Sequence, residues 1–315
     1  MACRVLISVD TELTWRHHCA GLGWRDNFAR SYEAAGVGIP FQLARLREHG
    51  LKACFFVDPM PALVYGLEPV RRMVGPILEA GQEIQLHIHS IWADLARSNE
   101  GKAFELTGLD EEGQLDLIAT GRDLLVEAGA PPPMAFRAGS YAADPATIAA
   151  LRRLGIRYDS SHNGSQHPWP SALPLDRDLI APVDLGGVVE IPVSQIEDKA
   201  GGLRHLQLCA ASSAEIRQAL LHAARQEHPL VTLVSHSFEL ATRDGLRRNR
   251  TVCRRFDRLC SFLAVEADNL PTVHFTDLDD LATGRAARPL PANGVRRARR
   301  MAEQLWSNLV YERTL

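Results

Sequence analysis

The sequence predicts an α/β protein, a distorted (β/α) barrel of about seven parallel strands with a C-terminal helical extension. Two observations predict this fold. Short, β-branched apolar runs alternate with longer amphipathic stretches along the 315 residues. This unit recurs roughly seven or eight times, and strands that alternate with helices form parallel sheets. We therefore expect a closed or nearly closed barrel, with an open, doubly wound sheet as the alternative.

Strands are expected where apolar and β-branched residues run together, and helices where apolar residues recur every three or four positions. The expected strands are Arg4–Asp10, Lys52–Asp58, Glu83–His89, Pro133–Arg137, Arg157–Ser160, Val188–Val193, Leu230–His236 and Thr272–Thr276. The expected helical faces are Ile39/Leu43/Leu46, Met73/Ile77/Ala80, Leu115/Ile118/Leu125/Val126, Ile148/Leu151/Leu154, Ile216/Leu220/Ala223 and Phe256/Leu259/Leu263.

Glycine and proline mark where these helices begin and end. Gly81, Gly129 and Gly155 each follow an apolar helical run, where a left-handed residue commonly ends a helix. Asp144 followed by proline is typical of a helix start. Residues 161–187 are rich in Gly, Pro, Ser and His, which predicts a long loop, and long loops in compact domains are commonly functional.

The chain is expected to divide into a barrel domain over residues 1–283 and a linker with a helix over 284–315. Prolines mark the linker, and four arginines lie on the helix together with an apolar face. The arginines are Arg296, Arg297, Arg299 and Arg300, and the apolar residues are Ala302, Leu305, Trp306 and Leu309. We expect this helix to dock on the barrel; a dimer contact and a site for an anionic partner are alternatives.

Composition excludes several classes of protein. The net charge of -3 gives no basic surface for nucleic acid, and no apolar stretch approaches the length of a membrane span. The six cysteines form no Cys-x-x-Cys pair, which argues against a zinc finger or a thioredoxin-like centre. A strand is predicted from the third residue onward, without room for a signal peptide, so a cytoplasmic location is expected.

Polar side chains gather at the ends of the expected strands. Loops at the carboxyl ends of parallel barrel strands build active sites, so these residues are expected around one rim. They are Asp10 and Glu12 after the first strand, His87 and His89 at the third, Arg137 at the fourth, Asp159 at the fifth and His236 at the seventh.

Two pairs among them suggest a metal. Asp10 and Glu12 are two residues apart, so in an extended chain their side chains point to the same side. The same holds for His87 and His89. Two carboxylates that close repel each other and favour a nearby cation. Imidazole and carboxylate are the usual ligands of zinc and similar divalent ions.

The order of six short motifs resembles the polysaccharide deacetylases, the NodB-homology enzymes of carbohydrate esterase family 4. The motifs are ISVDTE, KACFFVD, GQEIQLHIHS, FRAGSY, RYDSS and LVSHSFEL, and the resemblance runs from about Val5 to Leu278. Members of this family adopt a distorted (β/α) barrel and remove N- or O-acetyl groups with a divalent metal. The resemblance therefore implies a hydrolase of amide bonds that acts on an acetylated amino sugar or a similar glycan-like molecule, with zinc, or cobalt or manganese, as its metal.

The resemblance also implies roles for individual residues. Asp10 matches the general base, Arg137 the arginine that orients it, His236 the catalytic acid and Asp159 the acid's partner. His87 matches the first metal histidine. Thr11 and Ile91 stand where the family usually has an aspartate and a second histidine, so Glu12 and His89 are the nearest substitutes. Tyr141, through its backbone N–H, is expected to serve the oxyanion, and Trp92 and His162 to contact substrate.

Other functions stay open on the sequence alone. The two departures leave a metal-free, allantoinase-like C–N hydrolase as an alternative. A barrel phosphoesterase is disfavoured, because its His-x-His usually follows the first strand. A non-catalytic, glycan-binding barrel ranks lower, since the expected acid and base are both present. A homo-oligomer is also left open.

Overall fold

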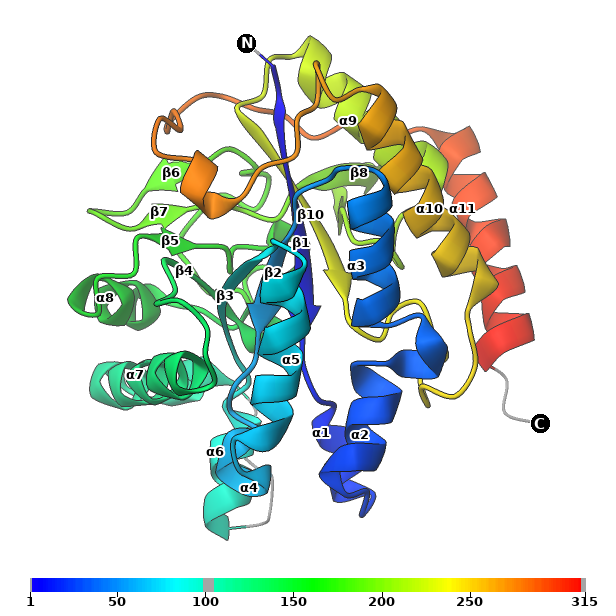
Figure 1. The fold of residues 1–315 in the computed structure, drawn as a ribbon. Helices are drawn as coiled ribbons and strands as arrows, with labels where there is room; N and C mark the ends of the chain where they lie inside the picture. Colours follow the sequence, from blue (N-terminus) through cyan, green and yellow to red (C-terminus); the bar gives the residue numbers. More distant parts are fainter. Residues whose placement is uncertain (1, 99–104, 313–315) are drawn as a thin grey trace.

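An eight-stranded sheet forms the centre of the computed structural model, which describes residues 2–98 and 105–312 (Figure 1). The strands lie in the order β10-β1-β2-β3-β4-β5-β7-β6, and all neighbours are parallel except β6 and β7. Their bounds are β1 Arg4–Thr11, β2 Cys54–Val57, β3 Glu83–Ile88, β4 Ala135–Ala138, β5 Tyr158–Asp159, β6 Val183–Asp184, β7 Val189–Glu190 and β10 Leu230–His236. The distorted (β/α) barrel predicted from the sequence is thus confirmed.

The segment after β7 closes most of the gap between β5 and β10. The N–H of Ile191 bonds the carbonyl of Asp159 at 2.7 Å, and the N–H of Ser194 bonds the carbonyl of Thr232 at 3.2 Å. The Ser194 hydroxyl accepts the N–H of Thr232 in return, at 2.9 Å. A hairpin of β8 Gln195–Lys199 and β9 Gly202–His205 follows. This wall is therefore built from irregular backbone and not from a regular strand.

One expected strand is absent. Within Thr272–Thr276, Thr272 forms a single bridge with Val5, and the chain then turns into the 3-10 helix Phe275–Asp277. The Asp277 carboxylate accepts the N–H of His274 at 2.8 Å, so local capping replaces strand pairing. The short strands β6, β8 and β9 were not expected, because their residues carry little of the apolar pattern that identifies a strand.

Helices cover the outside of the barrel (Figure 1). The larger ones have the expected apolar faces, and the glycines after α5, α7 and α8 have the positive φ of a helix end. Asp144 caps α8 through the N–H of Thr147, with Pro145 in the first turn. The helices are α1 Trp15–Cys19, α2 Trp24–Ser31, α3 Ile39–Glu48, α4 Ala62–Tyr65, α5 Glu68–Glu79, α6 Ile91–Ser98, α7 Glu111–Glu127, α8 Pro145–Arg153, α9 Ser213–Arg225, α10 Arg250–Val265 and α11 Gly294–Ser307. No helix within the described ranges is long and apolar enough to span a membrane.

Alternation along β1 decides which side chains enter the barrel. Val5, Ile7 and Val9 join the large apolar cluster under the helices, whereas Leu6 joins a second cluster inside the barrel. Phe56 and Phe275 belong to that inner cluster and meet edge to face, with ring centres 5.7 Å apart. Apolar side chains thus fill the floor of the barrel, and the same alternation brings a carboxylate, Asp10, to its mouth.

The helix α11 packs on the barrel domain through its polar side. Arg300 is buried and donates from Nε to Glu215 Oε1 at 3.0 Å, and it also pairs with Asp198. Ser307 bonds Asn249, and Arg255 of α10 bonds Glu303 at 2.9 Å. The apolar residues Leu305 and Trp306 of this helix are exposed to solvent.

We predict that Arg300→Ala destabilises the protein by about 3 kcal/mol, because it leaves the buried Glu215 carboxylate without its ion-pair partner. The matched control is Arg299→Ala, which removes an exposed arginine of the same helix and should change stability by about 0.5 kcal/mol or less. Urea denaturation followed by circular dichroism measures both. Equal effects of the two variants would contradict the proposed anchoring role of Arg300.

Candidate active site

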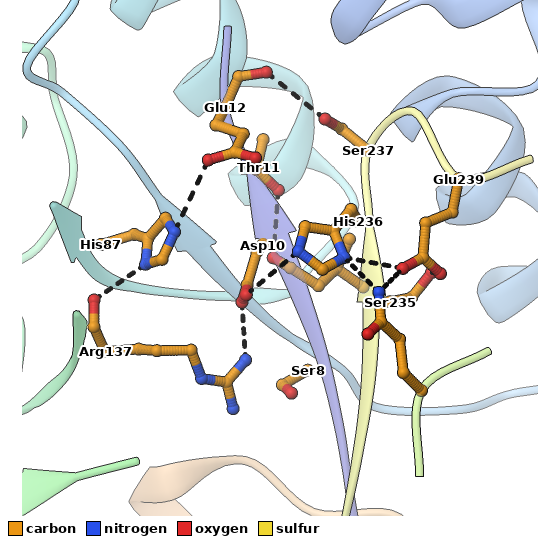
Figure 2. Close-up of polar contacts among 12 residues, drawn as sticks. Ser8, Asp10, Thr11, Glu12, His87, Arg137, Ser235, His236, Ser237 and Glu239 are labelled. Atoms are coloured by element: carbon orange, nitrogen blue, oxygen red, sulfur yellow. Dashed lines mark hydrogen bonds and ion pairs between the residues drawn. The ribbon is translucent and has the colours of Figure 1, made fainter. Parts of the chain in front are cut away.

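The register of the sheet brings four predicted residues together at the mouth of the barrel. Asp10 lies opposite His236 across the β1–β10 pair, and His87 lies opposite Arg137 across the β3–β4 pair. All four side chains point to the barrel interior, where polar contacts connect them (Figure 2). The sheet therefore assembles this group from residues far apart in the chain.

The centre of the site is the ion pair of Asp10 and Arg137. Arg137 Nη1 donates to Asp10 Oδ1 at 2.6 Å, and both side chains are buried. The rest of the guanidinium donates to the carbonyl and the hydroxyl of Ser160, both at 3.0 Å, and lies 4.3 Å from the ring centre of Phe56. Burial opposes ionisation of Asp10, but Arg137 and the neighbouring imidazoles outweigh it and lower the pKa of this carboxyl.

His236 faces Asp10 on one side and Glu239 on the other. Its Nε2 lies 3.7 Å from Asp10 Oδ2, and its Nδ1 lies 2.7 Å from Glu239 Oε1. Burial alone would lower the pKa of His236, but the hydrogen bond and the charge of Glu239, with the carboxylates at the end of β1, raise it to about 9. The site thus places an ionised carboxyl beside an imidazole that is cationic at neutral pH.

Glu239 takes the place that we expected for Asp159. A chain of side chains holds it: Gln207 donates to Glu239, and His205 Nε2 lies 2.5 Å from Gln207 Oε1. Nothing in the sequence analysis singled out Glu239, although it lies three residues after His236 in the motif LVSHSFEL. This spacing from His236 is the sequence signal that could have identified Glu239 as its partner.

Asp159 is fully buried and turned toward a different acid, Glu190. Ser161 Oγ donates to Asp159 Oδ1 at 2.6 Å, and the N–H of His162 donates to Glu190 Oε1 at 3.0 Å. Burial and the neighbouring negative charge raise the pKa of Glu190 well above its ordinary value. Asp159 and Glu190 lie opposite each other across the β5–β7 pair. Asp159 is not the hydrogen-bonding partner of His236.

Glu12, His87 and His89 form a cluster suited to a divalent metal. One ligand atom from each lies within 4.8 Å of the others. His87 Nε2 lies 3.2 Å from His89 Nε2 and 3.6 Å from Glu12 Oε2, and Glu12 also pairs with His89. Ligands about 2.1 Å from one tetrahedral zinc ion lie roughly 3.4 Å from each other, so these spacings fit such an ion.

A second contact orients His87 for this task. Its Nδ1 donates to the backbone carbonyl of Arg137 at 2.8 Å, which leaves Nε2 with its lone pair facing the cluster. Thr11 is buried and donates to the carbonyl of Val9, and Ile91 is buried at the start of α6. Neither Thr11 nor Ile91 contributes a ligand atom to the cluster. Glu12 and His89 contribute the carboxylate and the second imidazole instead.

The position of His89 depends on Gly139. A Cβ at Gly139 would lie 2.5 Å from His89 Nδ1 and 2.8 Å from two other ring atoms, closer than such contacts allow. Asp58, at the end of β2, is a further acid near this cluster. It is fully buried, one of its oxygens has no hydrogen-bond partner, and burial raises its pKa to about 6.

The three residues predicted to contact substrate have different surroundings. Tyr141 follows β4 with a φ of 61°, and its buried hydroxyl has no hydrogen-bond partner. Trp92 is fully buried and packs on Tyr65, with ring centres 5.7 Å apart, so it does not line the opening. His162 is also buried, with Nε2 3.1 Å from the carbonyl of Asp176.

A cavity of about 600 Å³ opens onto the metal-type cluster. Glu12 and His89 of the cluster line it, together with Ser140 and Phe238. The other lining residues are Leu13, Thr14, Trp15, Arg16, His17, Ile91, Glu105 and Arg243. Its size and mixed apolar and polar lining are those of a site for a small molecule.

Solved structures with the same fold include a protein from Mycobacterium smegmatis assigned to the polysaccharide deacetylases. It is 20% identical, with a TM-score of 0.55, over 92% of this chain and 96% of that one. A 4-alpha-glucanotransferase from Thermococcus litoralis has a TM-score of 0.57 at 14% identity, over 92% of this chain and 42% of the other. A family 4 carbohydrate esterase from Streptomyces lividans aligns at 14% identity, over 91% of this chain and 98% of that one, with a TM-score of 0.45.

The two similarities with TM-scores above 0.5 define the class of fold. No family model and no curated protein matches the sequence. At such low identities the structural similarity establishes the fold alone, which is the NodB-like barrel of the polysaccharide deacetylases. The resemblance inferred from the six sequence motifs is confirmed at that level. What the site does has to be argued from its own residues.

We predict that Glu239→Gln lowers the pKa of His236 by one unit or more, because the neutral amide no longer stabilises the imidazolium. The imidazolium of the wild-type protein should be lost as the pH rises through about 9, and that of the variant at lower pH. Titration of the His236 ring protons by NMR measures this shift. Glu127→Gln, an exposed acid on α7, is the control. An unchanged His236 titration would contradict the assigned partner.

We also predict that Gly139→Ala weakens zinc binding by about 10- to 100-fold, because the new methyl group displaces His89. Calorimetric titration of the chelator-treated protein with zinc measures the change. The matched control is Gly75→Ala, where an added Cβ meets no atom within 4 Å. Undiminished zinc affinity in Gly139→Ala would count against His89 as a ligand.

Proposed function

We propose that the protein hydrolyses an amide bond and removes an acetyl or similar small acyl group from an amino sugar or a related amide. The observation that carries this proposal is the opposition of an ionised Asp10 and a protonated His236, 3.7 Å apart, beside the Glu12–His87–His89 cluster. Amide hydrolysis needs a base for water and an acid for the departing amine. The fold, shared with a protein assigned to the polysaccharide deacetylases, supports the same class of reaction.

In the proposed reaction, Asp10 is the base. It accepts a proton from the attacking water, and Arg137 keeps it ionised for that purpose. The water oxygen forms the new bond to the acyl carbon. His236 then donates its proton to the amine nitrogen as the carbon–nitrogen bond breaks, and Glu239 keeps this imidazole protonated until then. The products are a free amine and a carboxylic acid.

The cluster of Glu12, His87 and His89 would hold the metal in this scheme. A bound divalent ion, for which zinc, cobalt and manganese are the candidates, supplies Lewis-acid polarisation of water and of the acyl oxygen. The carbonyl of Arg137 keeps His87 in the required tautomer. Tyr141, on the strained turn after β4, remains our proposal for a backbone donor to the oxyanion.

Glycoside chemistry is a second candidate, since a glucanotransferase shares the fold. Cleavage of a glycosidic bond commonly uses two carboxyl groups, of which one is protonated. Asp10 and Glu12 both have lowered pKa values, so neither provides that acid at neutral pH. The acid at the mouth of the barrel is instead the imidazolium of His236, and this favours amide hydrolysis.

A metal-free, allantoinase-like hydrolysis is the other candidate, because Thr11 and Ile91 replace the usual family ligands. The cluster geometry favours a metal, since the His87 and His89 nitrogens face each other at 3.2 Å. Activity measured after dialysis against a chelator, and again after zinc, cobalt or manganese is returned, separates the two reactions. A metal-free enzyme would keep its full rate throughout.

We predict that Asp10→Asn and His236→Ala each reduce acetate release from N-acetylated amino sugars by about 100- to 10,000-fold, since each removes a proton-transfer group. Acetate release from a panel of such sugars measures turnover, and circular dichroism verifies folding. Asp123→Asn, an acid exposed on α7, is the control and should keep the wild-type rate. Near-native rates in either site variant would refute the assigned roles.

A further inference from the structure

The solvent-facing side of α11 is apolar over its whole length. Its residues recur every three or four positions, so they lie along one side of the helix. They are Val295, Ala298, Ala302, Leu305 and Trp306 of α11 and Leu309 of the helical turn Asn308–Glu312 that continues it, and we call this set the α11 outer face. Every one of them is exposed, with 63% of Leu305, 64% of Trp306 and 50% of Leu309 accessible to solvent.

This orientation reverses that of an ordinary surface helix, which turns its apolar side to the core. In α11 the polar side chains Arg300, Gln304 and Ser307 make the contacts with the barrel domain. The residues of the α11 outer face are therefore not part of the buried core of this chain. A contiguous exposed apolar surface of this kind is typical of an interaction site.

The charges around the α11 outer face are positive. Arg299 is exposed beside Trp306 along the helix. The two acids of residues 294–312 are already engaged: Glu303 pairs with Arg255, and Glu312 accepts the N–H of Arg243 at 3.3 Å. An anionic partner therefore meets arginines on this side of the molecule.

Neighbouring elements add to this positive surface. A groove of about 350 Å³ between α9 and α10 is lined by the exposed Arg217 and Arg258, together with Arg255, which is buried and paired with Glu303. Arg255 joins this groove to α11 through its bond with Glu303. At the other end of the helix, exposed Arg247 donates to the carbonyl of Tyr311 at 3.0 Å, and exposed Leu246 lies next to it in the chain.

The apolar residues and the surrounding arginines together distinguish between two partners for the α11 outer face. A second copy of the chain would cover the apolar residues but would bring two arginine-rich surfaces together, and like charges in apposition oppose binding. A membrane with anionic lipids satisfies both features at once, because the acyl region accepts leucine and the headgroups attract arginine. Tryptophan, as in Trp306, is enriched at the membrane–water boundary.

We propose that the α11 outer face docks the protein on the surface of a membrane that contains anionic phospholipids. The helix lies in the plane of the interface, with Leu305, Trp306 and Leu309 among the acyl chains and the arginines at the headgroups. This proposal does not depend on the reaction that the protein catalyses.

Docking would bring the candidate active site near the membrane surface. Arg243, whose N–H bonds Glu312 at the end of this helical segment, also lines the cavity that opens onto Glu12 and His89. Figure 1 shows the C-terminal end of α11 turned toward the end of the barrel where β1 finishes. The loop after β10 thus connects the membrane-facing helix with the mouth of the site.

Flotation of the full-length protein with vesicles tests the proposal. One vesicle contains phosphatidylcholine alone, and the other contains phosphatidylcholine mixed with phosphatidylglycerol. We expect at least about tenfold tighter binding to the anionic vesicles, weakened by added salt. The double variant Leu305→Glu/Leu309→Glu should lose this binding by about tenfold or more. Val126→Glu on α7, on the opposite side of the barrel in Figure 1, should bind as the wild type does.

Three outcomes would overturn the proposal: no binding to anionic vesicles, equal binding to neutral ones, or undiminished binding by the double variant. Light scattering after size-exclusion chromatography tests the competing occupant. A wild-type dimer that the double variant converts to monomers, without vesicle binding by either, would assign the α11 outer face to self-association. Matching circular dichroism spectra and melting temperatures show that the variants fold, and Leu305 and Leu309 are 63% and 50% exposed, outside the buried core.

Discussion

The buried guanidinium of Arg137 is the interaction on which the rest of the site depends. It neutralises Asp10, bonds both the carbonyl and the hydroxyl of Ser160, and lies over Phe56. A buried charge is tolerated only when it is paired and its donors are satisfied. The backbone carbonyl of the same residue orients His87. One residue therefore couples the ionisation of Asp10, the proposed base, to the arrangement of the metal-type cluster.

Opposite electrostatic surroundings shift the pKa values of Asp10, the proposed base, and His236, the proposed acid, in opposite directions within one small volume. Asp10 has a lowered pKa because cations surround it, and His236 has a raised pKa because carboxylates surround it. Their direct contact is loose, at 3.7 Å, whereas each holds its outer partner closely. Arg137 fixes the one and Glu239 the other. Each of the two charges also contributes to the pKa shift of the other.

The sequence revealed most of the fold because periodicity reports on burial. The apolar run Arg4–Asp10 predicted the strand β1, whose carboxyl end carries Asp10, and the helical stripes predicted the covering layer. The same reasoning failed at Thr272–Thr276, where the apolar run fills the barrel floor without pairing as a strand. At α11, periodicity identified an apolar side but did not tell which surroundings that side faces.

For the site, strand ends could be predicted and side-chain partners could not. Asp10, His87, Arg137 and His236 meet as expected because parallel strands align their carboxyl ends. Asp159 has an equally suitable position in the chain, yet it turns toward Glu190 in the interior of the wall. Which of two acids contacts an imidazole depends on side-chain positions that differ by a few ångströms, and the pattern of strands in the sequence carries no information at that scale. Glu239 lies on a turn beyond β10, where no periodicity applies.

The irregular wall between β5 and β10 differs from the regular strands on the other side of the site. Asp10 lies on the regular strand β1, which pairs with a neighbour on both sides, and Glu12 and His89 follow directly after β1 and β3. The opposite wall contains the β8–β9 hairpin, and its His205 and the following Gln207 lead to the carboxylate of Glu239 behind His236. Insertions in that hairpin would alter the proton affinity of His236 without changing the strand that bears Asp10.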